Sequence, residues 1–133
     1  MSGASQQLEL LSLIVSPPIS RRIEPFGEVV RGEVDTVHRF QPDPRKHWFH
    51  AVIELHPHEG LWMWSTIYSI GGCGESYRVG PKWGRFAATK SDALHWAVEE
   101  LAERLASRDT DTAHSKQAAQ IMAWAQKLKG KMS

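Results

Sequence analysis

Cysteine is almost absent from this chain, which has a single one, Cys73, among 133 residues. One cysteine cannot form an intramolecular disulfide, so stability has to come from a packed core. A long hydrophobic run is also missing. The longest, from Leu10 to Val15, is interrupted by Ser12 and is too short to span a bilayer. We therefore expect a cytoplasmic protein without a membrane partner.

The net charge is also small: the chain has 16 Lys and Arg residues and 15 Asp and Glu residues, which gives a formal charge of +1. Dedicated nucleic-acid-binding proteins usually carry a larger positive excess, so such a role would depend on a local patch. What the chain does have is 41% hydrophobic and 23% charged residues, with six Trp and four Phe. This composition is typical of a globular domain with a substantial core.

An alternation of apolar and polar residues indicates an antiparallel meander. The alternating segments are residues 28–40, 47–56 and 61–70, with breaks at the two prolines of 41–46 and at Pro57–Gly60. A four-residue turn would pair Leu55 with Trp62, and every second pair along the hairpin would then match two core residues. We expect Trp62, Trp64 and Tyr68 to point into the core.

The second half of the chain indicates an α+β domain. One further strand is expected at 77–79 or 85–88, a sheet-packing helix at 91–107 with Thr89 or Ser91 as its cap, and a C-terminal helix at 113–129. We divide the chain into a domain at 1–108, which includes an amphipathic segment at 7–15 of either helix or strand, and a helical extension at 109–133. The stripe Ala118, Ile121, Ala125 and Leu128 on the last helix could pack on the meander, pair with a second copy or bind another partner.

The order of elements, in which strands are followed by the segment Phe86–Leu94 and a helix, resembles the topology of double-stranded-RNA-binding domains. The resemblance covers His47 to Leu105. In that family a basic run opens the final helix and grips phosphate. Here Lys90–His95 contains one lysine and an aspartate, so we transfer no binding residue.

Catalytic and metal-binding patterns are weak. His56 and His58 form the nearest approach to a ligand pair, but no acid or cysteine stands at a useful spacing beside them. Cys73 lies among glycines without a neighbouring general base. We therefore expect no metal, no cofactor and no enzymatic activity.

The remaining candidates are aromatic and basic residues that favour recognition. Exposed aromatic rings beside cations are enriched at recognition surfaces, which favours a non-enzymatic module that binds another protein. An accessory or inhibitory protein of a phage or plasmid would fit this description. The alternative is a nucleic-acid-binding module that uses the loop 78–90 as an anion site. The candidate site residues are Trp48, Arg78, Lys82, Trp83, Arg85 and Lys90.

Overall fold

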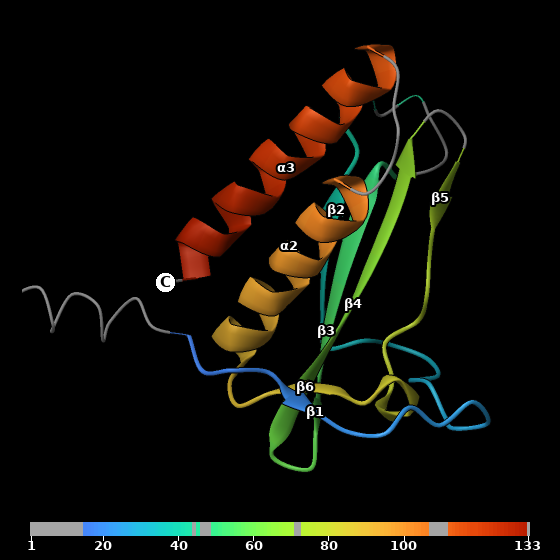
Figure 1. Cartoon of the computed structure of the whole chain (residues 1–133), viewed down its shortest axis with the longest axis vertical. Coiled ribbons are helices and arrows are strands. Elements are labelled where there is room, and N and C mark those ends of the chain that lie inside the picture. The colour runs from blue at the N-terminus through green and yellow to red at the C-terminus, as the bar shows by residue number, and fades with distance from the viewer. Residues whose placement is uncertain (1–14, 44, 46–48, 71–72, 107–111, 133) are drawn as a thin grey trace, which may run out of the picture.

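The computed structural model describes residues 15–43, 45, 49–70, 73–106 and 112–132. Figure 1 shows an antiparallel sheet with two helices on one of its faces, which confirms the predicted α+β class. The sheet has six strands in the order β1-β6-β4-β3-β2, and β5 pairs with β4 beside this path. The elements are β1 (Ile19–Ser20), β2 (Thr36–Phe40), β3 (Ala51–His58), β4 (Leu61–Ile70), β5 (Cys73–Glu75), a 3-10 turn η1 (Pro81–Trp83), β6 (Arg85–Ala87), α2 (Lys90–Ala106) and α3 (Thr112–Met132).

The main core lies between the sheet and the helices. Trp64 and Tyr68 of β4 are 5% and 2% exposed, and Trp62 packs half-buried against the same cluster. This confirms that the aromatic residues of β4 fill the interior. The other buried members come from β3 and from α2 and include Ile53, Leu55, Leu94, Val98 and Leu101.

The predicted strand pairing was wrong by two residues. Leu55 lies opposite Trp64 and His58 lies opposite Leu61, because the hairpin turns over only two residues, Glu59 and Gly60. Both turn residues have positive φ angles, of 51° and 80°, as the twist of a two-residue hairpin requires. β2 begins at Thr36, which lies opposite Leu55, so no residue of β2 pairs with Pro57. The missing N–H of Pro57 therefore interrupts no bond between β2 and β3.

The predicted strand 28–40 was also too long, since only Thr36–Phe40 joins the sheet. Residues before Thr36 instead cross the face opposite the helices. There Val30 and Val34 pack on a second buried cluster formed by Met63, Val79 and Phe86. Val30 and Val34 therefore alternate with polar residues because they are packed against this cluster, although they belong to no strand. Of the two candidates for a further strand, Arg85–Ala87 forms β6 and 77–79 does not form a strand.

Both predicted helices are present. The Thr89 hydroxyl accepts a hydrogen bond from the backbone N–H of Asp92 at 3.1 Å and so caps α2. Ile121 and Ala125 of α3 are fully buried in the main core, so the stripe on this helix packs within the chain. A homodimer through α3 would have to use another of its faces. The segment 7–14 lies outside the described residues.

Within the described ranges, neither helix combines the length and the apolar character that a membrane crossing requires.

Candidate functional site

Most of the predicted basic residues face a carboxylate. The Arg78 Nε lies 4.0 Å from an oxygen of Glu54, and the Lys90 Nζ lies 3.4 Å from an oxygen of Asp35. Arg85 forms an ion pair with Glu100. These pairs leave little free positive charge on the loop 78–90.

Of the two aromatic candidates, Trp83 and Trp48, the structure describes only Trp83. Trp83 is half-buried, since its indole N–H donates to the Arg78 carbonyl at 2.8 Å and its ring meets Tyr77 edge-on at 5.2 Å. The Lys82 ammonium lies over the same indole, 4.7 Å from the ring centre. Trp83 therefore serves mainly as packing for the loop. Trp48 lies outside the described residues.

A strap formed by residues 76–80 runs from β5 towards η1, and two carboxylates fasten it. The Tyr77 hydroxyl donates to Glu100 at 2.6 Å, on the side of the sheet that carries α2. The backbone N–H of Val79 donates to the buried Glu54 at 3.2 Å on the other side, where the Ser65 hydroxyl donates to the same carboxylate oxygen at 3.0 Å. Buried polar groups are stable only when they are hydrogen-bonded, so each carboxylate holds the strap in place.

The first of these contacts belongs to a larger polar network. β4 pairs with β6 at Trp62 and Met63 and with β5 at 68–70, so its edge at 64–67 has no ladder partner among the described residues. Arg104 fills part of this gap by donating to the carbonyl oxygen of Thr66 at 3.0 Å. The Thr66 hydroxyl donates in turn to Glu100. Burial, reinforced by the Glu100 carboxylate, raises the pKa of the Tyr77 hydroxyl.

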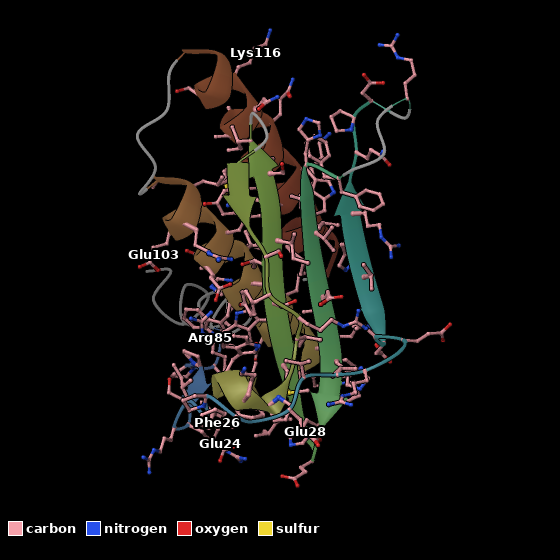
Figure 2. The ribbon with its side chains drawn as sticks, turned by 90° about the vertical axis from the view of Figure 1, so that its right-hand side faces the viewer. Glu24, Phe26, Glu28, Arg85, Glu103 and Lys116 are labelled. Atoms are coloured by element: carbon pink, nitrogen blue, oxygen red, sulfur yellow. The ribbon has the colours of Figure 1, made fainter. Side chains whose placement is uncertain are left out.

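The most exposed apolar side chains lie elsewhere, on a turn that was not among the sites predicted from the sequence. The apolar turn, as we name residues 23–27, carries Ile23 at 55% exposure and Phe26 fully exposed. Figure 2 shows Phe26 at the lower end of the molecule between Glu24 and Glu28, far from Glu103 and Lys116. Exposed apolar residues with charged neighbours, here Glu24 and Glu28, are one mark of a protein–protein interaction site.

Backbone hydrogen bonds hold the apolar turn in a defined position. Within it, the Gly27 N–H donates to the Glu24 carbonyl at 2.8 Å. The Glu24 N–H donates to the Lys82 carbonyl at 2.8 Å, and the Lys82 N–H donates to the Glu28 carbonyl at 3.2 Å. Glu24 within the turn and Glu28 directly after it are thus both bonded to Lys82 of η1.

Glycine permits this close approach between chain segments. Gly84 has a φ of 67°, and a side chain there would place its Cβ 2.1 Å from the carbonyl oxygen of Arg21. The N–H of Arg21 donates to the Gly84 carbonyl at 2.7 Å. The apolar turn therefore continues the β1–β6 pairing and rests on η1, next to the strap.

A depression of about 450 Å³ lies beside the apolar turn, on the face opposite the helices. Its lining includes the apolar residues Val30, Pro57, Met63 and Pro81 and the charged residues Glu28 and Arg31. Because Glu28 directly follows the apolar turn, the exposed ring and the depression are neighbours on one surface.

The histidine pair of β3 also lines this depression. The His56 Nδ1 accepts the backbone N–H of Asp35 at 3.1 Å, and the His58 Nε2 lies 3.7 Å from a Glu59 oxygen. Across the described part of the chain, no three His, Cys, Asp or Glu residues come together as a metal site would require.

The signal that could have identified the apolar turn is short. Pro25 followed by Phe26 and Gly27 is a turn pattern, since proline favours the second position of a β-turn and glycine the fourth. An aromatic residue inside a turn cannot follow the alternation of a strand, and this marks it as a candidate for surface exposure.

Comparison with known proteins adds no family: no protein-family model matches the chain, and no curated protein or solved structure matches it.

Proposed function

We propose that this protein is a non-enzymatic binding module that contacts another protein through the apolar turn. The observation that carries the proposal is Phe26, a fully exposed aromatic ring on a turn that is hydrogen-bonded to Lys82. Aromatic side chains dominate the binding energy of protein interfaces, and one ring buried in a partner pocket contributes roughly 1.5–3 kcal/mol.

The bracing of the turn supports the same proposal. A flexible loop loses conformational freedom when it binds, whereas a turn already fixed by its backbone bonds loses less. Gly84 and the strap fasten η1, and η1 fastens the apolar turn, so the backbone that carries Phe26 is held in one position. This arrangement resembles a preorganised contact for a partner.

Nucleic-acid binding through the loop 78–90 has less support. Arg78, Arg85 and Lys90 each lie beside a carboxylate, which cancels much of the field that would attract phosphate. Lys82 lies over Trp83 and offers a single cation.

The test places a photo-crosslinking amino acid at position 26 of the full chain in its native host. The crosslinked partner is identified by mass spectrometry, purified and titrated against the wild-type protein. We expect Phe26→Ala to weaken this binding at least tenfold, which corresponds to about 1.4 kcal/mol. The melting temperature should not change, because a fully exposed ring makes no contact that supports the fold.

A crosslinker at Glu103 provides the matched control, since this exposed residue of α2 lies far from Phe26 (Figure 2). Adducts that form equally at positions 26 and 103 would indicate random collisions. Such a result, or a Phe26→Ala variant that binds the purified partner as tightly as the wild type, would refute the proposed function.

A further inference from the structure

We propose that the apolar turn of one copy docks into the depression beside the turn of a second copy, so that the protein forms a two-fold symmetric dimer. This inference rests on the proposed function, because it names the partner of the same turn. The first ground is proximity: the apolar turn ends at Gly27, and the lining of the depression begins at Glu28. Two surfaces that adjoin on one molecule can be exchanged reciprocally across a two-fold axis.

Size is the second ground. A cavity of about 150 Å³ is enough to hold a benzene molecule. The depression measures about 450 Å³ and has Met63, Pro57 and Pro81 among its lining residues. One phenyl ring fits this volume. The depression is open to solvent, so a docked ring would contact Pro57 and Pro81 beside the charged side chains of Glu28 and Arg31.

Charge is the third ground. The apolar turn is flanked by Arg22 and contains Glu24, while the depression carries Glu28 and Arg31. Each surface thus has one charge of each sign. In the described part of the chain none of these four side chains belongs to an ion pair.

These charges complement one another across the proposed axis. With the ring of Phe26 in the depression of the partner copy, Glu24 can meet Arg31 of that copy, and Arg22 can meet Glu28. The symmetry repeats both pairs. Complementary charges fix the register of an interface even where they add little affinity.

The experiment is sedimentation velocity of the purified full chain over a concentration series that reaches the millimolar range. We expect a concentration-dependent dimer and a dimer dissociation constant at least tenfold higher for Phe26→Ala. Glu24→Arg and Arg31→Glu should each weaken the dimer as well. The double variant Glu24→Arg/Arg31→Glu should restore it, because each new arginine then meets a new glutamate of the other copy.

Glu103→Arg makes the same charge change as Glu24→Arg at an exposed position of α2 and should leave the dimer unchanged. Thermal melting of every variant separates loss of association from loss of folding. A wild type that stays monomeric at millimolar concentration would overturn the inference, and so would a dimer that is insensitive to Phe26→Ala.

The two proposals fail in different ways. A monomeric wild type whose position 26 still crosslinks to an identified host protein overturns the dimer and leaves the proposed function standing. A chain in which position 26 contributes neither to self-association nor to crosslinking overturns both.

Discussion

Replacing Tyr77 with phenylalanine tests whether the strap is fastened as the contacts indicate. The Tyr77 hydroxyl donates to Glu100 at 2.6 Å and accepts from Arg85 at 3.1 Å. Tyr77→Phe removes both bonds and keeps the ring, which continues to meet Trp83 edge-on. The variant therefore isolates the hydroxyl group.

The expected loss can be worked out from these bonds. A hydrogen bond to a charged group contributes about 1.5–3 kcal/mol to stability. Glu100 keeps its contacts with Arg85 and Thr66, so the loss should lie near the lower end, at about 1.5 kcal/mol. In urea, small proteins lose about 1–3 kcal/mol of stability per mol/L, so the unfolding midpoint should fall by about 0.5–1.5 M.

Alkaline pH provides a second measurement on the same pair. Burial and the Glu100 carboxylate raise the pKa of the Tyr77 hydroxyl above its ordinary value of 10.0. The unfolded chain releases this proton near pH 10 while the folded chain retains it. The stabilisation is thus complete below pH 10 and is lost as the pH rises towards the folded pKa. The stability difference between wild type and Tyr77→Phe should therefore be constant below pH 10 and should shrink as the pH rises above 10.

Urea titrations of the two proteins at several pH values measure both quantities. A difference below about 0.5 kcal/mol at neutral pH would show that the hydroxyl does not fasten the strap. A difference that stays constant above pH 10 would show that the tyrosine titrates as it does in water.

Two further predictions concern the core and the support of the apolar turn. Burial lowers the pKa values of His38 and His95, and the positive charges of Lys90 and Lys129, respectively, lower them further. The folded chain therefore disfavours the protonated imidazoles, and it is most stable above about pH 6.5, where both histidines are neutral. The free energy of unfolding, measured in urea, should therefore fall as the pH drops from 7.5 to 5, and a flat profile would contradict this. Gly84→Ala should destabilise the fold by at least about 2 kcal/mol, whereas Gly130→Ala, whose new Cβ meets no atom within 4 Å, should be neutral or stabilising. Equal melting temperatures for these two variants would refute the close approach at Gly84.

The faces of the strands could be predicted from the sequence, although their pairing could not. Side chains alternate with a period of two, so a register error of two residues leaves every side chain on the same face. Leu55 was expected opposite Trp62 and lies opposite Trp64, yet both tryptophans belong to the main core as expected. The register depends on turn length, and Pro57 suggested a turn that begins two residues too early.

The strand predicted at 28–40 shows a different limit. Alternation reports that every second residue is buried, but it does not report against which surface. Val30 and Val34 alternate because they pack on Met63 and Phe86, on the face away from the helices. The bond from the Val30 N–H to the Val79 carbonyl, at 2.8 Å, joins residues 49 positions apart. A local pattern carries no information about such a partner.

The same reasoning explains why the sequence pointed to the basic loop and not to the apolar turn that we propose as the contact surface. Arg85 near Lys82 suggests a positive surface, but its charge is met by Glu100, a residue of α2 that only folding brings to it. Phe26 suggests a core residue, but its turn is bonded to the backbone of Lys82 and its ring points into solvent. In both cases the decisive neighbour is distant in the chain. In the function proposed here, the loop 78–90 is the support of the apolar turn, since the backbone of Lys82 is bonded to Glu24 and Glu28 and three cations of the loop lie beside carboxylates.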